Sequence, residues 1–155
     1  MCNRTHSLLF RIIAAVLVVI LLTPATTFAS SDTVSPKASY YLDSYNAYIY
    51  NAAFGKIRVY FDVTGVNYMD DIGALTVKIY ESTDNSTWTW VKTYTNGDTP
   101  NLLGSNKIYY SSYVEYQGKI GRYYKAYVTL WAGKDGDGDT RYLWTHAHKA
   151  TLLAG

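Results

Sequence analysis

The feature that most constrains this fold is a strict alternation of apolar and polar residues. It recurs in KIRVYFDV (56–63), GALTVKIYES (73–82) and GRYYKAYVTLW (121–131). Successive side chains of a β-strand point to opposite faces of a sheet, so each segment predicts a strand with one buried and one exposed face. The expected buried residues are Ile57, Val59, Phe61, Val63, Leu75, Val77, Ile79, Tyr124, Ala126, Val128 and Leu130.

Four less regular segments complete the expected set of strands, at residues 39–50, 87–94, 107–116 and 140–149. Glycine, asparagine and aspartate are concentrated between the strands, where they favour turns. The expected turns and loops are 51–55, 65–73, 84–86, 96–106, 117–121 and 132–139. Short strands separated by turns predict an all-β fold, a single antiparallel β-sandwich of about seven strands.

The first thirty residues have the pattern of a secretory signal. The apolar run 12–22 follows Arg4 and Arg11 and is shorter than the roughly 20 residues that span a bilayer. Thr27 and Ala29 then supply the small residues that signal peptidase recognises. We therefore expect a secreted protein without a transmembrane segment in its mature chain; an uncleaved anchor is the alternative. The expected division is a signal peptide at 1–29, a short tail at 30–38, the sandwich domain at 39–150 and a C-terminal tail at 151–155.

Cleavage after Ala29 changes the charge and the cysteine content of the chain. It removes Arg4, Arg11 and the single cysteine, Cys2, leaving twelve Lys and Arg against twelve Asp and Glu. Such a balanced surface does not favour phosphate backbones, so we do not expect nucleic acid as a partner. A mature domain without cysteine has no disulfide and is held together by packing, to which its seventeen tyrosines contribute.

Two resemblances agree with the strand pattern. The segments YESTDNSTWTWV (80–91) and GKIGRYYKAYVTLWAG (118–133) resemble a fibronectin type III or immunoglobulin-like module, in which Tyr124 would be similar to the corner tyrosine of the sixth strand. SYYLDSYNAYIY, DDIGALTVKIYES and GRYYKAYVT also resemble a family of small secreted bacterial proteins of unknown function. That resemblance implies a Gram-positive source, and it brings no catalytic or binding residues because the family has no assigned activity.

An aromatic sheet face is the main candidate binding site. In a fibronectin-like arrangement the third, sixth and seventh strands are neighbours, which would place several aromatic side chains on one exposed face beside Lys78 and Lys125. Such a face can stack on sugar rings or receive a protein surface, but cross-strand aromatic pairs also stabilise a sheet without any ligand. The candidates are Tyr80, Tyr123, Tyr127, Trp131, Tyr142 and Trp144.

The segment KDGDGDT (134–140) raises the question of a calcium site. It lacks the glycine and glutamate positions of an EF-hand and by itself predicts a hairpin loop. In a sandwich, however, this loop and the loop at 65–73 lie at the same end, so their carboxylates would crowd one tip. Calcium binding and a solvated acidic tip are the two alternatives. The carboxylates are those of Asp70, Asp71, Asp135, Asp137 and Asp139.

Other motifs favour turns and exposed residues over chemistry. Ser82, Asp84 and Trp88 partly match a sialidase Asp-box, but we expect a hairpin turn capped by Asp84. His146 and His148 share a face of the last expected strand, where exposed histidines are more common than metal ligands.

The expected function is a secreted, non-catalytic binding or cell-surface interaction module without a required cofactor. No nucleophile pattern is present, and no catalytic residue is assigned. Two alternatives stay open: a secreted effector or toxin-like protein, and a small hydrolase using Glu81 or Glu115.

Overall fold

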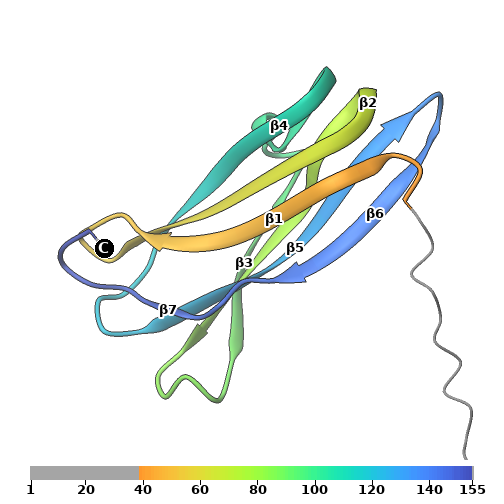
Figure 1. Cartoon of the computed structure of the whole chain (residues 1–155). Helices are drawn as coiled ribbons and strands as arrows, with labels where there is room; N and C mark the ends of the chain where they lie inside the picture. The colour runs from red at the N-terminus through yellow and green to blue at the C-terminus, as the bar shows by residue number, and fades with distance from the viewer. Residues whose placement is uncertain (1–38, 155) are drawn as a thin grey trace, which may run out of the picture. The chain divides into compact units, whose positions relative to one another are not determined.

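The computed structural model describes residues 39–154, which are almost entirely β-structure (Figure 1). The segments expected to be a signal peptide, 1–29, and a short tail, 30–38, lie outside the described residues. Every strand pairing is antiparallel, which confirms the predicted fold class. Within this part of the chain, no helix has the length and apolar character needed to cross a membrane. The elements are β1 (Leu42–Asn51), β2 (Lys56–Ser82), β3 (Thr89–Thr95), the 3-10 turn η1 (Pro100–Leu102), β4 (Leu103–Gln117), β5 (Tyr123–Lys134), β6 (Asp137–Trp144) and β7 (His148–Lys149).

The seven strands form one hydrogen-bonded sheet that is organised around β2. The first half of β2 lies between β1 and β4, and its second half lies between β3 and β5. β6 adds to the outer side of β5. The sheet folds over at the middle of β2, so its two halves face each other as the two layers of a β-sandwich do (Figure 1). The three strands expected to carry the exposed aromatic residues are adjacent, as predicted: the second half of β2 pairs with β5, and β5 pairs with β6.

Several predicted strand boundaries are wrong. The expected loop at 96–106 ends at Leu102, because β4 begins at Leu103. The expected turn at 65–73 is part of one continuous strand, because residues 71–73 pair with β4 on one side and β5 on the other. The expected last strand, 140–149, is divided into β6 and β7. The expected loop at 132–139 contains only two residues outside the strands, Asp135 and Gly136. Their positive φ angles of 54° and 83° suit a tight two-residue hairpin turn.

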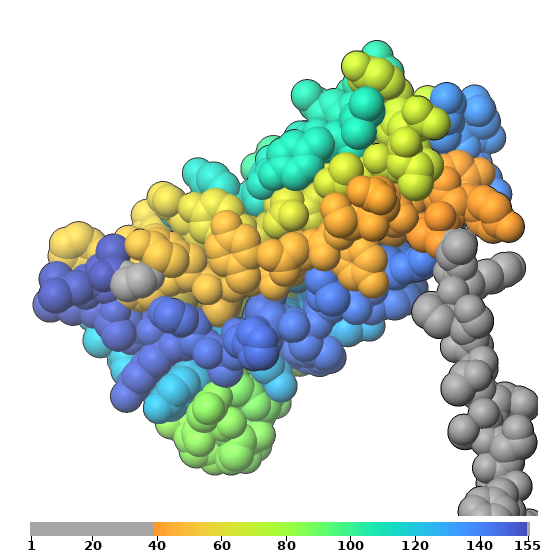
Figure 2. All heavy atoms as spheres, in the orientation of Figure 1, coloured from red at the N-terminus to blue at the C-terminus, as the bar shows by residue number. Residues whose placement is uncertain are grey.

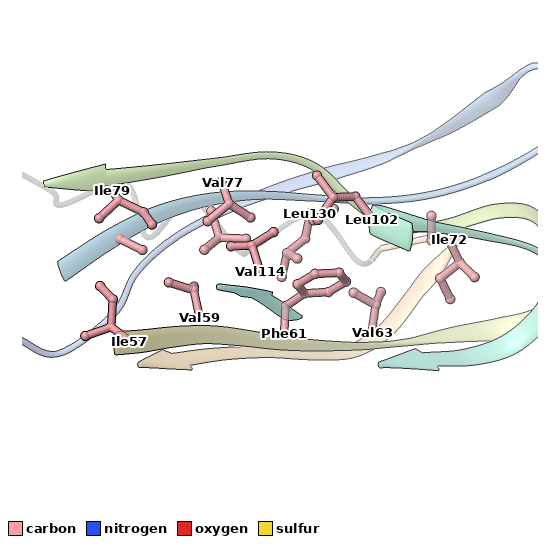
Figure 3. Close-up of a cluster of buried hydrophobic side chains, with 14 of the residues drawn as sticks. Ile57, Val59, Phe61, Val63, Ile72, Val77, Ile79, Leu102, Val114 and Leu130 are labelled. Carbon is pink, nitrogen blue, oxygen red and sulfur yellow. The ribbon is translucent and has the colours of Figure 1, made fainter. Parts of the chain in front are cut away.

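The core lies between the two halves of the folded sheet (Figure 3). Ten of the eleven residues expected inside are fully buried, which confirms the strand register of all three alternating segments. Leu75 is the exception and is only half-buried. A register shift between Ala74 and Thr76 interrupts the alternation there, so Ala74 takes the buried position instead.

Tyr124 stabilises the corner between β4 and β5. Its ring is fully buried, and its hydroxyl accepts a hydrogen bond from the backbone N–H of Lys119, five residues upstream, at 2.8 Å. The same hydroxyl donates to the Glu81 carboxylate at 2.6 Å. Burial and the neighbouring Glu81 carboxylate both raise the pKa of this phenol. This is the hydrogen-bond pattern of a tyrosine corner in β-sandwiches.

The C-terminal segment 151–154 was expected to be a tail, but it is hydrogen-bonded to the loop between β1 and β2. Phe54 and Gly55 donate their backbone N–H groups to the carbonyls of Leu152 and Thr151, at 2.8 and 2.9 Å. The side-chain amide of Asn51 donates to the carbonyl of Leu153. These contacts hold the segment against the domain.

Candidate functional site

Four of the six predicted aromatic residues form a connected group on the outer face of β2, β5 and β6. Trp144 is directly opposite Tyr127, and their ring centroids are 4.9 Å apart. Trp144 also lies 5.1 Å from Tyr80, and Tyr127 stacks on Tyr142 at 6.0 Å. We call Tyr80, Tyr127, Tyr142 and Trp144 the aromatic face. The two residues on the edge strand β6 are the most open, with Tyr142 61% and Trp144 51% exposed.

Lys125 joins the aromatic face to the loop between β2 and β3. Its ammonium lies 4.6 Å from the ring of Trp144 and 4.4 Å from that of Trp88. Both distances are within the range of cation–π attraction. Trp88 follows the projecting loop 83–87, which the green segment at the lower edge of Figure 2 shows. Sequence reasoning placed Lys125 beside the aromatic residues but did not include Trp88.

The other two predicted residues share the outer face of β5 but lie at its two ends. The ring of Trp131 covers Gly133 and Gly138, where an added Cβ would come within about 2.5 Å of it. Tyr123, near the start of β5, has the ammonium of Lys149 5.3 Å from its ring. No ring contact joins either residue to the aromatic face among residues 39–154.

A second row of tyrosines, which the sequence analysis did not find, crosses the other half of the sheet. Tyr48 on β1, Tyr60 on β2 and Tyr113 on β4 are directly opposite one another, with ring centroids 5.3 and 5.1 Å apart. The alternation of 56–63 did place Tyr60 outward. Its neighbours depend on pairing between distant strands, so only a known register would have identified the row.

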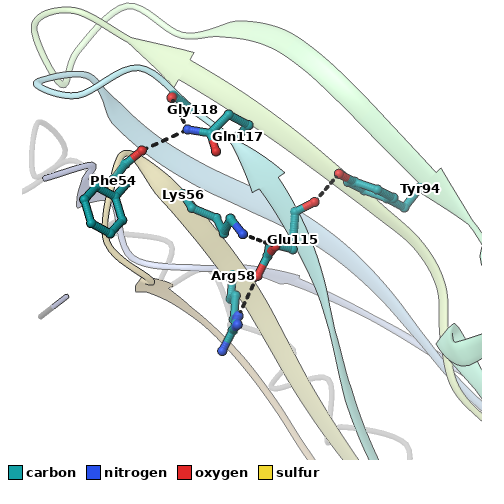
Figure 4. A network of polar contacts seen from close by, with 7 residues as sticks. All are labelled: Phe54, Lys56, Arg58, Tyr94, Glu115, Gln117 and Gly118. Carbon is teal, nitrogen blue, oxygen red and sulfur yellow. Dashed lines mark hydrogen bonds and ion pairs between the residues drawn. The ribbon is translucent and has the colours of Figure 1, made fainter. Parts of the chain in front are cut away.

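Beside this tyrosine row, Glu115 forms a polar network with two cations (Figure 4). Its carboxylate pairs with the ammonium of Lys56 at 2.7 Å and the guanidinium of Arg58 at 2.9 Å. Hydrogen bonds from Lys56 and Arg58 lower the pKa of Glu115, so it is an ionised partner in a surface ion pair. A shallow hollow of about 320 Å³ lies next to it, between β4 and the segment from β3 to η1, lined by Tyr94, Thr99, Asn101, Tyr113, Val114 and Glu115.

Four of the five predicted carboxylates of the acidic tip, those of Asp70, Asp71, Asp137 and Asp139, accept hydrogen bonds from different partners. The backbone N–H of Asp135 donates to Asp70 at 2.8 Å, and Ser105 donates to Asp71 at 3.0 Å. Asp70, Asp71 and Asp137 line a shallow hollow of about 160 Å³ together with Lys134. In the part of the chain that the structure describes, no group of three or more His, Cys, Asp or Glu side chains is arranged to hold a metal ion.

Asp139 belongs to the same tip but faces the start of the domain. Its carboxylate accepts hydrogen bonds from the Ser39 hydroxyl and from the Tyr41 backbone N–H, the latter at 2.9 Å. Burial opposes the ionisation of Asp139, but these hydrogen bonds prevail and lower its pKa. The nearby Asp137 accepts a long hydrogen bond of 3.4 Å from the Tyr41 hydroxyl.

The remaining motifs are parts of turns and connections. One carboxylate oxygen of Asp84 accepts hydrogen bonds from the Ser82 hydroxyl and the backbone N–H groups of Ser86 and Thr87, which confirms the predicted capped turn. The prediction that both histidines lie on one strand is wrong, because β6 ends before His146 and β7 begins at His148.

Comparisons with known proteins give no family for this chain. No protein-family model matches it, and no curated protein matches it. One solved structure with some similarity is a family 76 glycoside hydrolase from a bovine Bacteroides thetaiotaomicron strain, at 15% sequence identity and a TM-score of 0.30. The match covers 68% of this chain and only 20% of that chain.

Proposed function

We propose that this chain is a secreted, non-catalytic module that binds carbohydrate on the aromatic face. The observation that carries the proposal is the continuous contact between four aromatic side chains on one outer sheet face, two of them more than half exposed. Large aromatic side chains left open on one surface are typical of binding sites. Secretion is supported by the apolar run 12–22 and its flanking residues.

The chemistry of the aromatic face suits a sugar better than a purely apolar ligand. One side of a sugar ring carries C–H groups that pack against an aromatic ring, while its hydroxyls need hydrogen-bond partners. Lys78 is opposite Tyr127, and the hydroxyls of Thr76 and Thr129 lie 3.0 Å apart in the next row of the sheet. The aromatic rings would therefore pack against the C–H side of a sugar ring, and the polar groups beside them would form hydrogen bonds with its hydroxyls.

The two glutamates of the described chain favour a non-catalytic function. Glu115 is ionised and paired with two cations, and Glu81 accepts a hydrogen bond from the buried Tyr124. Glu81 also lies 3.7 Å from the ammonium of Lys119. A glycosidase needs a carboxyl that stays protonated as its general acid, and the two cations beside Glu115 lower its pKa and favour its ionised form.

A glycan array and titration calorimetry with residues 30–155 test this proposal. We expect Trp144→Ala to weaken binding by about tenfold or more, because aromatic side chains in the centre of a site contribute most of its affinity. Tyr48→Ala is the matched control. It removes a tyrosine that is 48% exposed and stacked across strands, but from the other half of the sheet.

Thermal unfolding separates binding from stability, since cross-strand aromatic pairs also stabilise a sheet by about 0.2 to 1 kcal/mol. Equal binding by the protein and its Trp144→Ala variant would show that the aromatic face is structural. Capture of a protein in pull-down experiments, without any glycan bound, would replace carbohydrate by a protein partner.

A further inference from the structure

Four exposed apolar side chains gather at the end of the domain opposite the acidic tip. They come from three separate segments: the β1–β2 loop, the β4–β5 loop and the C-terminal segment. Their exposures are 74% for Phe54, 57% for Ile120, 55% for Leu152 and 76% for Leu153. We call these four residues the apolar tip. Figure 2 shows the yellow-orange β1–β2 loop and the dark blue C-terminal segment together at this end.

The backbone holds the apolar tip in place at an energetic cost. Ala53, Phe54 and Gly55 have φ angles of 72°, 53° and 76°, and a left-handed conformation is rare for a bulky residue such as phenylalanine. Two hydrogen bonds hold Phe54 in this conformation. Its backbone N–H donates to the carbonyl of Leu152, and its own carbonyl accepts from the side-chain amide of Gln117 at 2.9 Å (Figure 4). The fold therefore maintains an outward-pointing Phe54 that contributes nothing to the core.

Cations surround the apolar tip. Lys56 and Lys119 are next in sequence to tip loops, and Arg122 and Lys149 lie beside the backbone hydrogen bond between Gly121 and Ala150. Two of these cations are paired with carboxylates, Lys56 with Glu115 and Lys119 with Glu81, and Asp84 follows in the turn after Ser82. The opposite end carries the five aspartates of the acidic tip, so the domain has one cationic end and one anionic end.

We infer that the apolar tip inserts into the surface of an anionic lipid bilayer, with the cations around it facing the lipid headgroups. A bilayer surface can take up isolated apolar side chains and attracts neighbouring cations. A stable protein interface instead buries about 800 Å² on each partner, which four side chains on convex loops do not supply. Docking end-on leaves the aromatic face accessible, so this inference does not depend on the proposed carbohydrate site.

Vesicle co-sedimentation tests the inference with residues 30–155, which include the whole described fold and omit the apolar run 12–22. The vesicles are phosphatidylcholine alone, or phosphatidylcholine with about one third phosphatidylserine. We expect binding to the mixed vesicles only, weakened by high salt. Phe54→Asn should reduce this binding by about tenfold or more, since it removes a side chain that the lipid would bury. Lys119→Gln with Lys149→Gln should reduce it by about fivefold for each charge removed.

Asparagine is chosen at position 54 so that a loss of vesicle binding cannot be explained by a loss of stability. Asparagine adopts the left-handed conformation more readily than phenylalanine, so the variant should melt at or above the temperature of the unaltered protein. Tyr68→Asn is the matched control, because Tyr68 is 59% exposed but lies on the bend of β2 at the opposite end. The inference is overturned if the unaltered protein does not bind mixed vesicles, or if Phe54→Asn and Tyr68→Asn bind equally. Self-association that depends on Phe54, without vesicle binding, would show a contact between copies instead.

Discussion

At the scale of single residues, the position of a tyrosine in the sheet decides what it does. Tyr124 is fully buried and its hydroxyl is hydrogen-bonded to Lys119 and Glu81, so it contributes to the stability of the fold. Tyr142 is 61% exposed on an edge strand and is available to a ligand. The two residues differ in which face of the sheet they occupy and in whether their strand is inside the sheet or at its edge.

Asp84 should make the stability of the domain depend on pH. The backbone N–H groups of Thr87 and Ser86 lower its pKa well below the ordinary value. Its contribution is therefore fully present above the unfolded-state pKa of about 3.9 and is lost as pH falls through the folded-state pKa. We expect Asp84→Ala to lower the melting temperature at pH 7, with a smaller difference from the unaltered protein below about pH 4. Circular dichroism melting curves at several pH values measure this.

Asp43→Ala is the control for this experiment, because Asp43 is an exposed carboxylate on β1. We expect it to change the melting temperature little at any pH. If the loss in Asp84→Ala were the same at pH 7 and at pH 2, the ionised carboxylate would not be what stabilises the turn.

At the scale of elements, the long strand β2 determines the shape of the sheet. It pairs with β1 and β4 in its first half and with β3 and β5 in its second half, so it belongs to both layers. Register shifts between Thr64 and Met69 and between Ala74 and Thr76 mark where it bends. Bulges of this kind increase the local twist and let one strand change direction without losing its neighbours.

Gly73 should be essential to the bend of β2. Its φ is 144°, and an added Cβ would lie 2.2 Å from the backbone carbonyl oxygen of Leu102. We expect Gly73→Ala to destabilise the domain by about 1 to 3 kcal/mol or more, because the chain would have to move the η1 backbone away. Gly97→Ala is the matched control: its nearest neighbour would be a side-chain atom at 3.8 Å. Urea unfolding of both variants measures the difference, and equal losses would contradict this account of the bend.

At the scale of the whole molecule, charge is separated between the two ends of the domain. The acidic tip brings together side chains from the bend of β2 and the β5–β6 hairpin, and the apolar tip with its lysines occupies the other end. The net charge near zero expected for residues 30–155 conceals this separation. A composition balanced overall can therefore still give a molecule with two chemically different ends.

Calcium should leave the stability of the acidic tip unchanged. Asp70, Asp71 and Asp139 already accept hydrogen bonds, and Lys134 lines the same hollow as Asp137. We expect equal melting temperatures in millimolar calcium and in chelator. Calcium at about 100 times its dissociation constant would add about 2.7 kcal/mol, or several degrees. Such a rise, absent in Asp70→Asn with Asp137→Asn, would instead establish a calcium site.

Local patterns in the sequence by themselves determined the fold class, most of the core and which faces are exposed. Side-chain alternation depends only on the two-residue period of a strand, so Phe61, Val77 and Val128 could be placed inside without knowing their neighbours. The aromatic face was predictable in the same way once β2, β5 and β6 were assumed to be adjacent. The capped turn at Asp84 was predictable because its hydrogen bonds lie within a few residues.

Tertiary structure alone decided the features that join distant segments. The continuity of β2 through 65–73 depends on β4 and β5 pairing on both of its sides, which overrides the local turn signals. The row of Tyr48, Tyr60 and Tyr113 depends on the register of three strands. The apolar tip depends on backbone hydrogen bonds that join Phe54 and Gly55 to the C-terminal segment. Each is a contact between residues far apart in the chain, and a local pattern contains no information about which distant partner a strand or loop will meet.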